Sequence, residues 1–211
     1  MATSVTQITN YPIIEKLTTF QLEDYCSREP ILCYAGTIYS TSNQKPILNA
    51  INNIESVKYH LAGNIERKYL LELQKHSAWD KVRFLGILTK DEINSFYEKA
   101  IIGLVIYDYL PNLGYKRGTL GSNKLFEYME AGLPIICTNY DLWKEIIDKY
   151  DCGICVQPNN SLEIENAIKF LIENKEKAYQ MGQNGKNAVS TEYNWETQKD
   201  IYIDLYKRHL T

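Results

Sequence analysis

The sequence lacks any apolar stretch long enough to span a bilayer, and it does not open with a basic segment followed by an apolar one. These absences argue against a membrane-spanning helix and a leader peptide, so we expect a cytoplasmic protein. An excess of positive charge is also missing, because 23 Lys and Arg residues are set against 26 Asp and Glu, for a formal net charge of −3. This balance gives no electrostatic support for nucleic-acid binding.

Cysteines are few and odd in number: Cys26, Cys33, Cys137, Cys152 and Cys155. Cys33 and Cys137 lie within apolar runs, which favours reduced, buried thiols. Cys152 and Cys155 have CxxC spacing, but there is no second pair to complete a zinc site, and the motif does not open a helix as a redox motif does. We therefore expect no metal or redox role for these cysteines.

Short apolar runs rich in β-branched and aromatic residues are what the sequence does contain. The predicted strands are Ile31–Ile38, Val57–Gly63, Val82–Leu85, Gly103–Tyr107, Ile135–Thr138 and Gly153–Val156. The helical patterns cover Pro46–Asn53, Ile65–His76, a helix capped by Thr89, Asn123–Ala131, Leu142–Tyr150, Leu162–Glu173, Lys175–Ser190 and Trp195–Leu210. This alternation predicts an α/β fold, a doubly wound Rossmann-like parallel sheet of order 3-2-1-4-5-6. No GxGxxG motif follows the first strand, which argues against a dinucleotide-dependent oxidoreductase.

The position of a ligand follows from this topology. Such sheets bind ligands beyond the carboxyl ends of the strands, where the strand order reverses. Two long irregular segments flank that point here, Gly36–Asn43 and Tyr109–Asn123. The second leads into a predicted helix whose free N–H groups form an anion site, with Gly121 for close approach and Ser122 or Asn123 as the cap.

Two charged residues in the first turns of this helix suggest which ligand binds. Lys124 is a cation at a helix N-terminus, which is unfavourable for the helix itself and would be explained by a bound phosphate. Glu127 lies on the same face as Asn123, one turn further on, and a carboxylate there suits the two hydroxyls of a ribose. The alternative is a solvated glutamate on an ordinary amphipathic helix. The pattern predicts a phosphate-plus-sugar site.

The segment Asn123–Thr138 resembles the donor-site helix and the following strand of GT-B glycosyltransferases of the family-4 type, the glycosyl transferases group 1. Shorter segments resemble that family in the same order along the chain, over about residues 8–210: Ile31–Gly36, His60–Gly63, Val82–Gly86, Met181–Gly185 and Tyr193–Trp195.

The resemblance implies the C-terminal, nucleotide-sugar-binding half of a two-domain enzyme. Residues 1–25 would be a remnant or linker from the acceptor domain, and the stretch 6–12 within them looks like a strand and turn. Residues 26–192 would form the donor domain, and residues 193–211 a helix that crosses back to the acceptor domain, with an exposed apolar side. Family members are usually retaining and metal-independent, so the resemblance implies no metal and no resident cofactor.

The resemblance also implies the roles of individual residues. Glu127 would bind the ribose hydroxyls, and the diphosphate would lie against the start of the helix and against Gly36 and Thr37, with the base read by the backbone of Ile87. The predicted donor-binding set is Gly36, Thr37, Ile87, Gly121, Ser122, Asn123, Lys124, Leu125 and Glu127. No catalytic residue is assigned. The partners would be a nucleotide-sugar donor and, through the missing N-terminal domain, a glycan or glycolipid acceptor, with peripheral membrane contact of the longer protein left open.

The sequence departs from the family pattern at its cations and at one carboxylate. Thr119 stands where the family often has a glutamate, and Thr37 stands where it has an arginine. Lys45 is the only basic residue near that arginine position. Either Lys124, Lys116 and Arg117 compensate, or activity is reduced.

Two other functions remain alternatives to sugar transfer for polysaccharide or cell-surface glycan synthesis. A non-enzymatic nucleotide-binding or scaffold module would explain the missing cations. A sugar-nucleotide epimerase shares the architecture but needs acid–base groups in the cleft. The three histidines, His60, His76 and His209, are predicted on a strand, at a helix end and at the C-terminus, where none is well placed for that role.

Overall fold

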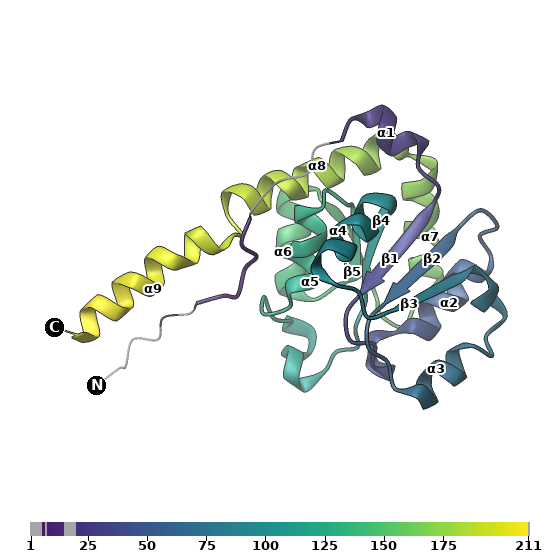
Figure 1. Cartoon of the computed structure of the whole chain (residues 1–211), viewed down its shortest axis with the longest axis horizontal. Helices are drawn as coiled ribbons and strands as arrows, with labels where there is room; N and C mark the ends of the chain where they lie inside the picture. The colour runs from purple at the N-terminus through teal and green to yellow at the C-terminus, as the bar shows by residue number, and fades with distance from the viewer. Residues whose placement is uncertain (1–5, 7, 15–19, 211) are drawn as a thin grey trace.

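The computed structural model of the chain describes residues 6, 8–14 and 20–210, and parts of the predicted linker (1–5, 7 and 15–19) and the final residue lie outside the described residues. The described residues form one parallel sheet of six strands in the order β3-β2-β1-β4-β5-β6 (Figure 1). The strands are β1 Ile31–Ala35, β2 Lys58–Ala62, β3 Val82–Gly86, β4 Ile102–Val105, β5 Ile135–Thr138 and β6 Gly153–Val156. The predicted fold class and strand order are confirmed.

Helices connect the strands and cover both faces of the sheet (Figure 1). They are α1 Leu22–Ser27, α2 Gln44–Asn52, α3 Arg67–Leu73, α4 Lys90–Lys99, α5 Asn123–Glu130, α6 Asp141–Tyr150, α7 Ser161–Glu173, α8 Lys175–Thr191 and α9 Trp195–Leu210. Thr89 caps α4 as predicted, since its side chain accepts the Glu92 N–H and the Glu92 carboxylate accepts the Thr89 N–H. The short helix α1 was not predicted.

Three predicted elements differ from the structure. The first strand ends at Ala35, because Gly36 turns the backbone with φ 143°, and Ile38 forms only an isolated bridge with Ile65. That bridge uses Ile65, so α3 begins after it at Arg67. The strand predicted within residues 6–12 is wrong for the described positions, which are irregular.

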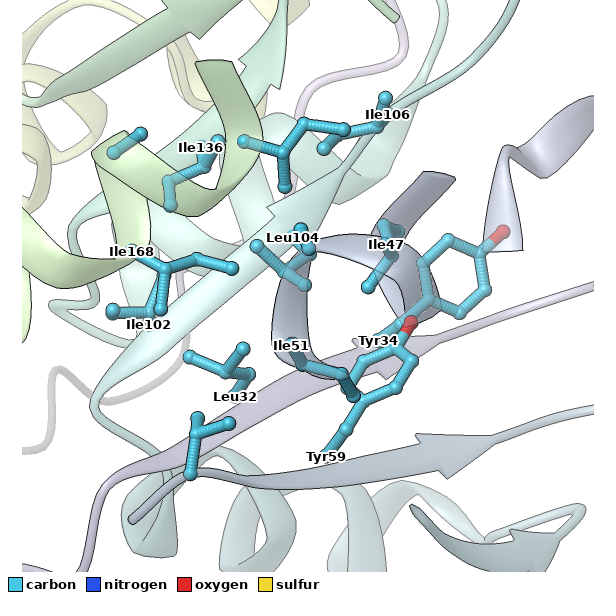
Figure 2. Packing of buried hydrophobic residues seen from close by; sticks show 14 of the residues in the cluster. Leu32, Tyr34, Ile47, Ile51, Tyr59, Ile102, Leu104, Ile106, Ile136 and Ile168 are labelled. Carbon is cyan, nitrogen blue, oxygen red and sulfur yellow. The ribbon is translucent and has the colours of Figure 1, made fainter. Parts of the chain in front are cut away.

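The core lies in two layers, one on each face of the sheet, because successive strand residues point to opposite sides. On one face, Leu32 of β1 packs with Ile51 of α2 and Ile168 of α7 (Figure 2). On the other face, Cys33 of β1 packs with a cluster that includes Tyr128 of α5. Burial on both faces accounts for the nearly continuous apolar strands.

The last helix, α9, projects away from the sheet (Figure 1). Its predicted exposed apolar side is present: Ile201, Tyr202 and Tyr206 are 40%, 47% and 58% exposed. Its start is held by two hydrogen bonds to the N-terminal segment: the Trp195 N–H donates to the Pro12 carbonyl, and the Gln198 side-chain oxygen accepts the Thr9 N–H, both over 2.9 Å. The proposed crossing of this helix to another domain stays a prediction. No helix in the described part of the chain is both long and apolar enough to cross a membrane.

Candidate functional site

A pocket of about 670 Å³ opens at the carboxyl end of β1, where the strand order reverses. Helix α4 forms one side of it, α5 forms another, and the N-terminal segment 10–13 closes a third. Its lining includes Gly36, Asn123, Lys124 and Glu127 from the predicted donor-binding set. The structure therefore brings together residues that lie up to 91 positions apart in the sequence (127 − 36 = 91).

The floor of the pocket is a close approach between chain segments at Gly36. The Gly36 N–H donates to the Ala62 carbonyl over 2.9 Å, which keeps the turn against the end of β2. A Cβ added at Gly36 would lie 2.1 Å from Cε and 2.2 Å from Nζ of Lys124. Only glycine at position 36 leaves the Lys124 ammonium its place over the end of β1, and φ 143° favours glycine as well.

The start of α5 faces this point without a side-chain cap. Ser122 occupies the N-cap position, but its side chain makes no capping hydrogen bond, so the predicted cap by Ser122 or Asn123 is wrong. The Asn123 side-chain oxygen instead accepts a hydrogen bond from the amide of Asn10 over 3.5 Å. The first N–H groups of α5 thus remain available to an anion, with the positive end of the helix dipole behind them.

Lys124 adds a full charge to these donors. No described carboxylate forms an ion pair with it, and its ammonium lies 5.9 Å from the centre of the Tyr34 ring. Burial lowers the pKa of Lys124, while the negative charge of Glu127 acts in the opposite direction. A half-buried cation without a counter-ion is costly, and a phosphate bound at Gly36 and the α5 start would supply one.

Glu127 is oriented by a residue that sequence reasoning missed. The Tyr97 hydroxyl, on α4, donates a hydrogen bond to Glu127 Oε2 over 3.1 Å. Burial, followed by the charge of Glu127, raises the pKa of Tyr97 well above its ordinary value, so the hydroxyl keeps its proton and stays a donor. Oε1 of Glu127 has no hydrogen-bond partner among the described residues and can accept from a ligand hydroxyl.

The remaining members of the predicted set do not line this pocket, and their roles stay predictions. Thr37 lies just beyond Gly36, where its carbonyl accepts the Tyr34 hydroxyl over 2.9 Å. Ile87 is 77% exposed on the loop after β3. Gly121 and Ser122 precede α5 at its open side, and the Leu125 side chain is fully buried, which leaves only its backbone N–H for a ligand.

The structure separates Lys45, the basic residue near the missing arginine, from Lys124, one of the three cations expected to compensate for it. Lys45 forms an ion pair with Glu72 over 2.5 Å and does not line the pocket. Lys116 donates to the Asn139 carbonyl, and neither it nor Arg117 lines the pocket. Lys124 lines it, together with Lys90 of α4, which sequence reasoning had not assigned to the site.

The N-terminal segment is the largest part of the site that the sequence did not predict. Asn10, Tyr11, Pro12 and Ile13 all line the pocket. The Tyr11 ring packs edge-on against Phe126 of α5 with centroids 4.8 Å apart, which fixes the segment beside α5. No local signal marks these residues, because their contacts are made with α5 and α9, more than 100 positions away along the chain.

Solved structures with the same fold include glycosyltransferases and proteins crystallised with nucleotides. S. aureus TarM, in a complex that contains UDP, aligns with a TM-score of 0.78 at 14% identity, over 97% of this chain and 40% of that one. Anabaena HepE in complex with UDP-glucose aligns with a TM-score of 0.77 at 17% identity, over 95% and 57%. The C-terminal domain of a glycosyl transferase group 1 family protein (LpcC) from Francisella tularensis aligns with a TM-score of 0.60 at 20% identity, over 87% of this chain and 96% of that domain.

Sequence comparison gives the family. An uncharacterized glycosyltransferase of Methanocaldococcus jannaschii is 33% identical over 183 residues, which cover 84% of this chain and 45% of that protein. The chain thus spans about half the length of this relative. The profile described as "Glycosyl transferases group 1" matches residues 24–188. The chain therefore belongs to the glycosyl transferases group 1 family, and its fold is the Rossmann-like half of a GT-B architecture.

Proposed function

We propose that this chain is the donor-binding domain of a glycosyltransferase and that its pocket binds a nucleoside-diphosphate sugar. The observation that carries the proposal is the position of Lys124, which lies over Gly36 and has no counter-ion among the described residues. It lies at the uncapped start of α5, in the same pocket as the carboxylate of Glu127. The UDP and UDP-glucose complexes of TarM and HepE support this choice of ligand.

In this proposal each group acts on one part of the donor. Lys124 and the N–H groups of α5 bind the diphosphate and stabilise the negative charge that develops on it as the sugar leaves. Glu127, held by Tyr97, accepts hydrogen bonds from the ribose hydroxyls. The base lies toward α4 and the loop that carries Ile87. Thr37, Ser122 and Gly121 are proposed to complete the diphosphate side through their backbones.

The acceptor half belongs to a longer protein in this proposal. The chain spans 45% of its M. jannaschii relative, and α9 presents an unburied apolar side that a further domain can cover. That domain would bind a glycan or glycolipid acceptor in polysaccharide or cell-surface glycan synthesis, with retention of configuration and without a metal. Residues 1–25 would link the two halves. The 211-residue chain alone is then expected to transfer no sugar.

The competing functions would require different residues in the pocket. Among the described residues no histidine lines it: His60 stacks near Phe96 at 6.4 Å on the other side of α4, and His76 accepts the Ala78 N–H at the start of a short 3-10 turn. This argues against an epimerase, as does the family. A non-enzymatic module is distinguished by nucleotide binding without transfer once the acceptor domain is present.

The test is a titration series on the full chain. UDP, GDP, ADP and CDP are first compared by thermal shift, since a bound ligand raises the unfolding temperature. The best diphosphate and its nucleoside are then titrated calorimetrically into the chain, into Lys124→Ala and into Lys144→Ala, whose lysine lies on α6 outside the pocket. Loss of one charge-assisted contact should weaken the diphosphate about 10- to 100-fold in Lys124→Ala alone. Equal affinity of all three proteins would refute the proposed site.

A further inference from the structure

Two thiols from different parts of the sequence meet at the edge of the sheet. Cys137 of β5 and Cys155 of β6 are direct partners in the parallel register of these strands, and their sulfurs lie 3.7 Å apart. In the sequence Cys155 also stands in CxxC spacing with Cys152, a spacing for which no metal or redox role was expected.

The two thiols differ in access and in acidity. Cys137 is fully buried, whereas Cys155 is half-buried on the edge strand. The hydrogen bond from Cys137 lowers the pKa of Cys155, and the charges of Lys144 and Lys116 act in the same direction. The same hydrogen bond and burial raise the pKa of Cys137. An accessible, more acidic thiol beside a second thiol is the arrangement found at oxidation-sensitive cysteine pairs.

We propose that Cys137 and Cys155 form an oxidative modification site that a peroxide converts to a disulfide. The Cys155 thiolate attacks one peroxide oxygen, the O–O bond breaks, and the released hydroxide takes a proton to become water. Cys155 is then a sulfenic acid. The Cys137 sulfur attacks the Cys155 sulfur, the S–O bond breaks, and hydroxide leaves with the Cys137 proton as a second water. Two thiols lose two electrons in all, and one peroxide is reduced to two waters.

The disulfide is expected to act on the loop after β4, which covers residues 106–122 between β4 and α5. A disulfide brings the sulfurs from 3.7 Å to about 2.05 Å, which shifts the carboxyl ends of β5 and β6. Thr138, next to Cys137, holds that loop, since its Oγ1 accepts the Tyr107 N–H and donates to the Tyr107 carbonyl, both over 2.8 Å. The loop runs from there to the start of α5. Oxidation is therefore expected to move the loop.

Trp143 offers a probe of this movement that needs no nucleotide. Its indole N–H donates over 2.8 Å to the carbonyl of Thr119, within the same loop. A change in the loop should alter the Trp143 fluorescence. A Trp143→Phe variant identifies the contribution of this residue among the three tryptophans of the chain.

The experiment treats the full chain with hydrogen peroxide. We expect the intact mass to fall by two hydrogens, the thiols titratable after denaturation to fall from five to three (5 − 2), and a peptide that joins Cys137 to Cys155 to appear. Cys155→Ser should prevent all three changes. Cys26→Ser, which removes another half-buried thiol, should permit the same bond. Dithiothreitol should reverse the shift in Trp143 fluorescence.

Several results would overturn the inference. They are a Cys152–Cys155 bond, a sulfinic acid at Cys155 with Cys137 still a free thiol, and an unchanged mass. A disulfide that leaves the Trp143 fluorescence unaltered would overturn its action on the loop. Because none of these measurements involves a nucleotide, the inference and the proposed donor site stand or fall separately.

Discussion

Tyr97 of α4 reaches across the pocket to α5, where its hydroxyl donates a hydrogen bond to Glu127 Oε2 over 3.1 Å. The ring is buried and packs edge-on against Tyr128 with centroids 5.3 Å apart, so the hydroxyl is fixed from behind. Glu127 is thereby held in one orientation before a ligand arrives. This preorganisation reduces the side-chain entropy that ligand binding would otherwise cost.

Replacing Tyr97 with Phe should therefore weaken nucleotide binding without unfolding the chain. The ring and its packing remain, and only the hydrogen bond to Glu127 is lost. We expect the affinity for the best-binding nucleoside diphosphate of the series above to fall by about 2- to 10-fold in calorimetric titration. The fall should be smaller for the 2′,3′-dideoxy analogue, which has no hydroxyls for Glu127. Tyr150→Phe, which removes a hydroxyl bonded to Glu192 away from the pocket, is the control. An equal loss for the dideoxy analogue would mean that Tyr97 does not act through the ribose.

A methyl group at Gly36 should displace Lys124. The added Cβ would lie 2.2 Å from Nζ, and φ 143° adds backbone strain. Gly86→Ala is a matched control, because Gly86 also has a positive φ, 66°, but a Cβ there meets no atom within 4 Å. Both variants should lose about 1–2 kcal/mol of unfolding free energy in urea. Only Gly36→Ala should also lose diphosphate affinity, by about 10-fold or more. Parallel losses of affinity in both variants would count against the contact between Gly36 and Lys124.

The sheet was predictable from the sequence because its signals are local. Runs such as Ile135–Thr138 are apolar and flanked by turn residues, and the Thr89 cap needs only residues three positions apart. Element ends were less predictable where tertiary contacts decide them. The first predicted strand ran past Ala35 because its apolar pattern continues to Ile38, whereas Gly36 turns the chain toward Gly63.

Only the part of the site that lies on one continuous segment of the chain was predictable from the sequence. The motif around Lys124 and Glu127 lies on one helix, so its spacing indicated the chemistry. Tyr97, Asn10 and the partner of Cys155 join the structure through contacts between distant segments, which no periodicity in a single sequence records. For the same reason nothing in the sequence linked Cys155 to Cys137, which the β5–β6 register places side by side.

The buried charge of Lys124 should lower the free energy of unfolding of the chain, although the same charge supports ligand binding. Burial lowers its pKa, so the unfolded chain binds this proton more tightly than the folded chain does. The cost is fully present below the lowered pKa and declines as pH rises from there toward the ordinary lysine value. Lys124→Met should therefore raise the free energy of unfolding at pH 7, by about 0.5–2 kcal/mol, and abolish the preference for diphosphates.

The pH series separates this effect from a general gain in packing. The stability difference between Lys124→Met and the parent chain, measured by urea unfolding, should shrink as pH rises above the lowered pKa of Lys124. Lys144→Met, on the exposed face of α6, should give a difference of the opposite sign, because the hydrogen bond to Asp148 raises the pKa of Lys144 and its charge therefore stabilises the folded chain. A difference that stays constant up to the ordinary lysine pKa would show that burial of the charge is not its cause.

The N-terminal segment should contribute to ligand binding through Asn10. Its amide donates to the Asn123 side chain at the open start of α5, and the segment is fastened at both sides, by Tyr11 against Phe126 and by the Pro12 carbonyl that accepts the Trp195 N–H. Asn10→Ala removes the amide but leaves these two anchors in place. The released Asn123 side chain then becomes free to turn and to cap α5, where it competes with a phosphate for the same N–H groups. We expect diphosphate affinity to fall by about 2- to 10-fold, with the nucleoside less affected.

Asn53→Ala is the control, because it deletes a similar exposed amide, bonded to Glu165 over 3.0 Å and remote from the pocket. If Asn10→Ala and Asn53→Ala both bind the diphosphate as the parent chain does, segment 10–13 is a wall of the pocket that takes no part in recognition.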